Sequence, residues 1–136
     1  MKLSVCMITY NHEKYIGQAI EGVLMQKTNF DIELLIGEDF SNDNTRNICM
    51  GYKNKYPDKI KLLLREKNIG MMRNFIQTLN TCKGKYIALC DGDDYWTDPL
   101  KLQKQVDFLE ANPEYALCYH RVNILTHNGI ITDENE

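Results

Sequence analysis

Short apolar runs alternate with amphipathic stretches along this chain of 136 residues. Apolar runs at 3–9, 32–37, 60–64 and 86–90 predict strands, and the lack of alternation in the first indicates that both its faces are covered. Apolar side chains at helical spacing predict helices over 13–26, 45–56, 71–81 and 99–111. A fifth strand is expected at 115–122, followed by a hairpin over 123–131 that turns at Asn128-Gly129. Strands that alternate with helices predict an α/β protein with three layers, α/β/α, around a mainly parallel sheet.

The stretch from Tyr86 to Trp96 joins the fourth predicted strand to an acidic loop, Asp91-Gly92-Asp93-Asp94. Three carboxylates in four residues repel one another unless a cation or hydrogen-bond donors lie among them. Hard oxygen ligands of this kind suit Mg²⁺ or Mn²⁺, which commonly bridge carboxylates to the phosphates of a substrate. Taken alone, the loop is equally consistent with a solvated turn, because Asp and Gly are common turn residues.

Polar clusters also end two other predicted strands, as Thr9-Tyr10-Asn11 and Glu38-Asp39. Asp39 alone is compatible with an ordinary turn or helix cap. In a parallel sheet, however, all three clusters lie on the same edge, beyond the carboxyl ends of the strands, where ligands bind in open α/β sheets. The convergence predicts a binding site.

Composition narrows the class of protein. The length suits one domain over residues 1–136. A net charge of −3 without a basic stripe gives no reason to expect nucleic acid. The five cysteines are widely spaced, which predicts small buried side chains in a reducing compartment, and we therefore expect a cytoplasmic protein. No apolar run approaches the roughly 20 residues of a membrane span.

Four segments together resemble the family-2 glycosyltransferases. Residues 4–11 resemble the opening strand of the family, and residues 38–45 resemble its acidic turn, often DDGSTDNT. Asn68-Ile69-Gly70, followed by Arg73-Asn74, resembles the N-x-G…RN loop, and residues 91–94 resemble the D-x-D metal motif. The ordered set, which spans about residues 2–119, is more specific than any one segment.

The resemblance implies a GT-A fold that holds a nucleoside-diphosphate sugar, most often a UDP-sugar, with Mn²⁺ or Mg²⁺. By position, Thr9, Tyr10 and Asn11 would line the nucleotide pocket, and Asp39 would accept a hydrogen bond from the base. Arg73 would lie near the nucleotide or diphosphate. In the acidic loop, Asp91 would approach the ribose or the metal, Gly92 would leave room for a close approach, and Asp93 would be the main metal ligand.

Two residues depart from the family pattern. Glu38 stands where the family often has Asp, and Phe40 where it usually has Gly. A phenylalanine is not expected to adopt a positive φ, so the turn is predicted to differ locally.

The resemblance also implies inverting transfer to an acceptor hydroxyl, which needs a general base, usually a carboxylate. In the family this base follows well after the D-x-D motif, and this chain ends about forty residues past it. No catalytic residue is therefore assigned. Asp133, Glu134 and Glu136 lie in a polar tail, and His120 falls in a predicted apolar strand, where a structural role is expected.

We therefore expect the donor-binding half of a glycosyltransferase, truncated before its acceptor-binding half. The expected parent acts in bacterial-type surface polysaccharide or glycoconjugate synthesis, at or near the inner face of the membrane, on a saccharide or lipid-linked acceptor. An apolar surface left by truncation would favour a homodimer. Two alternatives stay open: a non-catalytic nucleotide-sugar or metal-binding module, and a phosphoryl-transfer hydrolase. The polar Thr-Tyr-Asn end of the first strand counts against the hydrolase.

Overall fold

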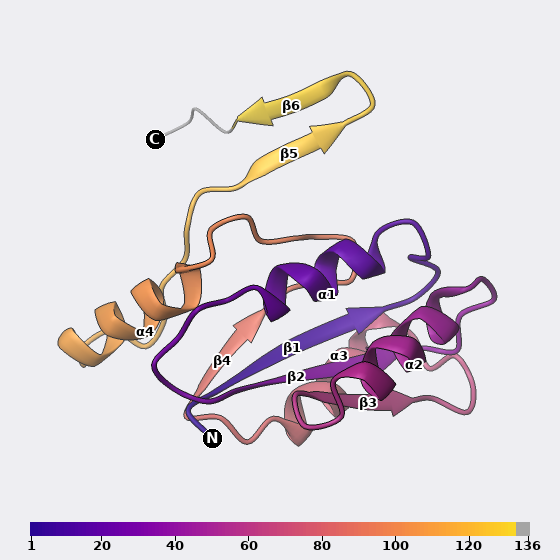
Figure 1. Cartoon of the computed structure of the whole chain (residues 1–136), viewed down its shortest axis with the longest axis horizontal. Helices are drawn as coiled ribbons and strands as arrows, with labels where there is room; N and C mark the ends of the chain where they lie inside the picture. Colours follow the sequence, from indigo (N-terminus) through magenta and orange to yellow (C-terminus); the bar gives the residue numbers. More distant parts are fainter. Residues whose placement is uncertain (133–136) are drawn as a thin grey trace. The chain divides into compact units, whose positions relative to one another are not determined.

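The structure, a computed structural model, describes residues 1–132, and its elements follow the alternation expected from the sequence (Figure 1). The chain divides into two compact units, the first covering residues 1–103 and the second beginning at Lys104. One nucleotide-sugar-binding domain over residues 1–136 stays a prediction. None of the helices within residues 1–132 combines the length and apolarity that crossing a bilayer requires.

The first unit is built on one parallel sheet. Its strands are β1 (Leu3–Thr9), β2 (Ile32–Glu38), β3 (Ile60–Leu64) and β4 (Tyr86–Leu89), in the spatial order β3-β2-β1-β4. β1 lies parallel to β2 along its whole length, with Thr9 opposite Glu38 at the carboxyl edge. Because β4 pairs with β1 and not with β3, the strand order reverses between β1 and β4. Open α/β sheets bind ligands at the carboxyl edge beside such a reversal.

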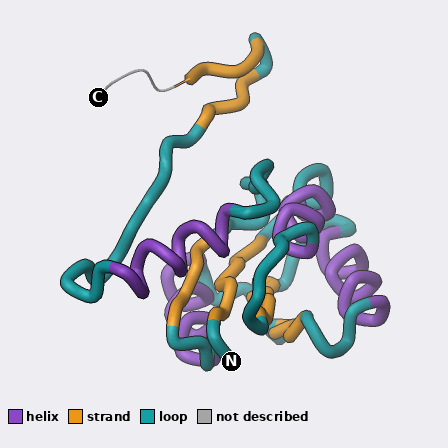
Figure 2. Tube along the Cα trace, turned by 60° about the vertical axis from the view of Figure 1, so that its left-hand side comes forward, coloured by secondary structure: helices purple, strands orange, loops and turns teal. Residues whose placement is uncertain are grey.

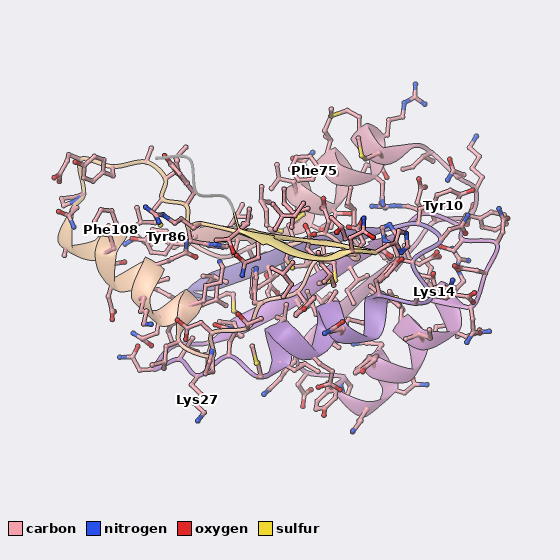
Figure 3. The ribbon with its side chains drawn as sticks, turned by 90° about the horizontal axis from the view of Figure 1, so that it is seen from above. Tyr10, Lys14, Lys27, Phe75, Tyr86 and Phe108 are labelled. Carbon is pink, nitrogen blue, oxygen red and sulfur yellow. The ribbon has the colours of Figure 1, made fainter. Side chains whose placement is uncertain are left out.

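Helices cover both faces of the sheet. α1 (Ile16–Leu24) and α2 (Thr45–Lys55) contact each other on one face, and α3 (Met71–Thr81) packs against β1 and β2 on the other (Figures 1 and 3). α3 comes very close to the sheet at Gly37, where an added Cβ would lie 2.6 Å from Asn74 Oδ1. The three-layer α/β/α architecture with a mainly parallel sheet is therefore confirmed.

Two helices are shorter than the sequence pattern indicates. α1 begins at Ile16 and not near residue 13, because residues 10–15 form the turn that leaves β1. α4 (Lys101–Ala111) begins after Pro99, where Asp98 caps the chain by accepting a hydrogen bond from Leu100 N at 2.9 Å. Helix starts depend on which backbone amides find acceptors, and a periodic pattern alone does not specify this.

The prediction of a strand at residues 115–122 is wrong. Residues 112–122 form a loop after α4 (Figure 2), and the Tyr115 ring stacks on Phe108 with 5.7 Å between ring centres. The hairpin is confirmed as β5 (Asn123–Thr126) and β6 (Gly129–Thr132). Its turn is His127-Asn128, one residue earlier than predicted, and Gly129 begins β6. A strand forms only where a neighbour accepts its backbone hydrogen bonds, and within residues 104–132 β5 and β6 pair only with each other.

Candidate functional site

A cavity of about 330 Å³ lies at the carboxyl edge of the sheet. It brings together the three polar clusters expected from the sequence, which end β1, β2 and β4. Its lining consists of Ile8, Thr9, Tyr10, His12, Asp39, Asn68, Gly70, Met71, Asn74, Asp91 and Asp93. A larger hollow of about 680 Å³ is lined by Lys27, Asp31 and other residues near the amino-terminal ends of the strands, and it contains none of these clusters. The smaller cavity is therefore the candidate site.

The loops after β1 and β2 are joined by hydrogen bonds. Asn11 N donates to Ser41 Oγ at 3.0 Å, and Asn42 N donates to Asn11 Oδ1 at 2.8 Å. The Asn42 side-chain amide also donates to the Tyr10 hydroxyl at 3.2 Å. Tyr10 lines the cavity, whereas Asn11 does not, because its side chain is used to join the two loops. The nucleotide-lining role of Asn11 stays a prediction.

Asp39 anchors the loop before α3. Its side chain is buried, with 2% of the residue exposed. Oδ1 accepts a hydrogen bond from Ile69 N at 2.8 Å, and Oδ2 accepts one from Gly70 N at 3.0 Å. The Asn68 amide donates to the Asp39 carbonyl at 3.0 Å. Two motifs separated by 30 residues are thus joined by hydrogen bonds. Each carboxylate oxygen keeps a second lone pair that can accept a hydrogen bond from a ligand in the cavity.

The turn at Phe40 corrects an expectation. Phe40 does adopt a positive φ, 61°, as the glycine of the family would. Surrounding contacts hold this unfavourable conformation. Ser41 N donates to Glu38 Oε1 at 2.8 Å, the fully buried Glu38 carboxylate pairs with Arg46, and the Arg46 guanidinium lies 5.2 Å from the centre of the Phe40 ring. Tertiary contacts therefore override the local preference at this position.

The acidic loop packs closely against the end of β1. Gly92 N donates to Ile8 O at 2.9 Å, and Asp94 N donates to Asp91 O at 3.0 Å. A Cβ added at Gly92 would lie 2.6 Å from Thr9 Oγ1 and 3.0 Å from His12 Nδ1. A glycine is required here because the backbone itself touches these two side chains, which is the close approach expected from the sequence.

Asp91, Asp93 and Asp94 each offer one carboxylate oxygen, and these oxygens lie within 4.8 Å of one another. Burial raises the pKa of Asp91, and the charges of Asp94 and Asp93 raise it further. The pKa of Asp94 is raised in the same way, by burial and then by Asp93. The ionised form of each carboxylate is unfavourable beside the others, and a divalent cation bound among their oxygens would relieve this repulsion. Asp94 was not among the predicted ligands, although it belongs to the same motif.

His12 is a site residue that the motif pattern did not identify. Its Nδ1 lies 3.0 Å from Thr9 Oγ1, and its Nε2 lies 3.7 Å from Asp93 Oδ2. It also lines the cavity. The sequence signal was its place directly after Thr9-Tyr10-Asn11, because polar side chains just past a strand end share the ligand-binding edge.

Several other candidates lie outside the cavity lining. Arg73 is exposed in the first turn of α3. His120 is exposed in a loop and not in a strand, with Nδ1 2.7 Å from Arg121 O. Cys6, Cys49 and Cys90 are buried as predicted, whereas Cys82 and Cys118 are only half-buried. Burial together with Asp94 and Asp91 raises the pKa of the Cys90 thiol to about 12, which disfavours a thiolate. Asp133, Glu134 and Glu136 lie outside the described residues.

Comparisons with known proteins agree with this geometry. A family model described as glycosyl transferase family 2 matches residues 4–134. An uncharacterized protein of Mycobacterium tuberculosis is 44% identical over 127 residues, which is 93% of this chain and 37% of the relative. The dTDP-rhamnosyl transferase RfbG of Shigella flexneri is 34% identical over 117 residues, 83% of this chain and 39% of RfbG.

Among solved structures, TarS 1–349 of S. aureus in complex with UDP superposes with a TM-score of 0.72 at 29% identity. The match covers 83% of this chain and 33% of TarS 1–349. The chain thus spans well under half the length of each of these relatives.

Proposed function

The chain belongs to glycosyl transferase family 2, and from this premise we propose that it forms the donor-binding half of a metal-dependent glycosyltransferase. The observation that carries the proposal is the cavity at the carboxyl edge, where Thr9 and Tyr10, Asp39, and the acidic pair Asp91 and Asp93 meet. A nucleoside-diphosphate sugar needs a base-binding end and a cation-binding end, and in this proposal the cavity would supply both.

We propose a UDP-sugar as the donor. Asp39 would accept the N3–H of uracil with its free lone pairs, and Tyr10, which is 40% exposed, offers a ring on which a base can stack. Thymine carries the same N3–H. TarS was crystallised with UDP and RfbG is named for a dTDP-sugar, and both names support a pyrimidine donor. Arg73 stands in the first turn of α3 and would approach the nucleotide or diphosphate only with a donor bound.

Asp91, Asp93 and Asp94 would hold Mn²⁺ or Mg²⁺ by their clustered oxygens. Bound there, the cation supplies stabilisation for the negative charge that develops on a diphosphate leaving group. Gly92 lets this loop lie against Thr9 and His12, which would fix its carboxylates relative to a nucleotide bound beside Tyr10 and Asp39.

The finer parts of the proposal concern the whole parent protein. We propose inverting transfer to a hydroxyl of a saccharide or lipid-linked acceptor, in surface polysaccharide or glycoconjugate synthesis, in the cytoplasm at the inner face of the membrane. The general base would come from an acceptor-binding half. Ile87 and Leu89 of β4, 44% and 58% exposed, are apolar surface through which two copies could pair.

Calorimetric titration of UDP, dTDP, GDP and CDP, with and without Mn²⁺, tests the donor site. We expect UDP to bind only with metal, and Asp93→Ala to abolish this binding. Asp58→Ala, which removes an exposed aspartate that lines the other hollow, is the matched control. Equal UDP affinity in Asp93→Ala and the unsubstituted chain would overturn the metal assignment. Failure of the folded chain to bind any nucleotide would overturn the donor site.

The competing function is a nucleotide-sugar-binding module without transfer. It predicts the same calorimetric result, so only a radiolabelled-sugar transfer assay with a candidate acceptor separates the two. A generic phosphate-ester assay addresses the hydrolase alternative, and we expect no turnover.

A further inference from the structure

We propose that His12 positions the acidic loop. Its imidazole ring, held by Thr9, turns the Asp93 carboxylate toward Asp91 and Asp94. This inference rests on the proposed metal site. Asp93 needs such a partner because its side chain is 51% exposed, whereas that of His12 is 25% exposed. An exposed aspartate has free rotamers, and ordering it on cation binding costs side-chain entropy.

The His12 backbone is fixed from both sides. Its N–H donates to Thr45 Oγ1 at 2.8 Å, and its carbonyl accepts hydrogen bonds from Tyr15 N and Ile16 N, both at 2.9 Å. His12 therefore joins the start of α1 to the start of α2. A side chain on so constrained a backbone has few alternative positions, which is what a positioning role requires.

The ring orientation follows from its two neighbours. Nδ1 lies 3.0 Å from Thr9 Oγ1, and Nε2 faces the Asp93 carboxylate at 3.7 Å. A neutral imidazole carries one N–H, and a lone pair on Nε2 would repel the carboxylate. The favoured tautomer therefore has the proton on Nε2, with the Thr9 hydroxyl donating to Nδ1. Second partners of this kind orient ligating groups in metal sites.

The loop backbone is also packed against this pair. Gly92 lies between Asp91 and Asp93, and a Cβ there would meet Thr9 Oγ1 at 2.6 Å and His12 Nδ1 at 3.0 Å. His12 thus lies beside the loop at two points, next to the Gly92 backbone and opposite the Asp93 carboxylate, whereas Thr9 lies beside Gly92. The packing at Gly92 limits the movement of the main chain next to Asp93, and the imidazole faces the carboxylate.

Two substitutions of His12 test its contact with Thr9 and its contact with Asp93 separately. His12→Asn keeps a group near Nδ1 for Thr9 but loses the atom that faces Asp93, whereas His12→Gln keeps an amide N–H that reaches toward Asp93. The probe is Mn²⁺ alone, titrated into the full chain and followed by water-proton relaxation. We expect His12→Asn to weaken Mn²⁺ binding about tenfold or more, as for other outer partners of metal ligands, and His12→Gln to weaken it less. His127→Asn makes the same change in the β5–β6 turn and should leave Mn²⁺ affinity unchanged.

A second measurement needs no substitution. The ¹⁵N chemical shifts of the His12 ring at pH 8 should report the Nε2–H tautomer, and the Nδ1–H tautomer would overturn the proposal. So would unchanged Mn²⁺ affinity in a folded His12→Asn, checked by urea unfolding without metal. Either of these results would contradict only the role of His12 and not the metal site itself. If the unsubstituted chain binds no Mn²⁺, with or without UDP, the metal site and the role of His12 both fall.

Discussion

Replacing Asp39 with asparagine should loosen the loop before α3. The two side chains have the same size, but an amide has one acceptor oxygen where the carboxylate has two. In the structure Oδ1 and Oδ2 accept the Ile69 and Gly70 amides at 2.8 and 3.0 Å. In Asp39→Asn the side-chain NH₂ group would face one of these backbone N–H groups. Both groups are donors, so that N–H would lose its acceptor.

The magnitude follows from this geometry. Leaving one buried N–H without an acceptor costs about 1–3 kcal/mol, and replacing a charge-assisted hydrogen bond by a neutral one costs about 1 kcal/mol more. The free energy of unfolding should therefore fall by about 2–4 kcal/mol. With a denaturant slope of about 1–3 kcal/mol/M, the urea midpoint should fall by about 0.7–4 M.

Urea unfolding followed by circular dichroism measures the loss, and hydrogen exchange at the Ile69 and Gly70 amides shows whether it comes from this loop. Asp58→Asn makes the same chemical change at an exposed aspartate and should shift the midpoint very little. A loss below about 1 kcal/mol, with both amides still protected, would refute the anchoring role.

The same variant bears on recognition of the base. A disordered loop should weaken every nucleotide alike, because residues 68 and 70 line the cavity. Loss of a hydrogen bond to uracil should instead change the ratio of UDP to CDP affinity. An unchanged ratio in Asp39→Asn would contradict base recognition by Asp39 while leaving its structural role intact.

Two further predictions concern the Phe40 turn and the acidic loop. Phe40→Gly should be more stable than Phe40→Ala by about 1 kcal/mol in thermal unfolding, because both lack the ring and only alanine is strained at φ 61°; equal stability would show that the strain is absent. The folded-state pKa of Asp94 is raised, so its contribution to stability is present at low pH and is lost as pH rises through that pKa. Asp94→Asn should therefore stabilise the metal-free chain at pH 7, by no more than about 1 kcal/mol because the carboxylate is only partly removed from solvent, and the gain should vanish at pH 3. Destabilisation at pH 7 would contradict a raised pKa of Asp94, whether from burial or from the charge of Asp93.

Local patterns were sufficient for most of the fold. Each strand of the parallel sheet is a short apolar run bounded by polar or turn residues. In the two central strands, β1 and β2, burial on both faces leaves such a run few other conformations. α3 was predicted with its observed bounds, Met71–Thr81, because its apolar positions recur at helical spacing after a turn. The acidic loop was found as a candidate site because its composition changes abruptly at the end of a strand.

The tertiary structure decided what depends on partners distant in the sequence. Residues 115–122 have strand-like composition but pair with no strand of the described residues, so they form a loop. Phe40 takes a positive φ because buried Glu38 and Arg46 hold its turn. His12 enters the site only because β4 lies beside β1 and brings Asp93 to its ring. Periodicity and composition determine which elements form, whereas side-chain roles are set by contacts that exist only after the sheet is assembled.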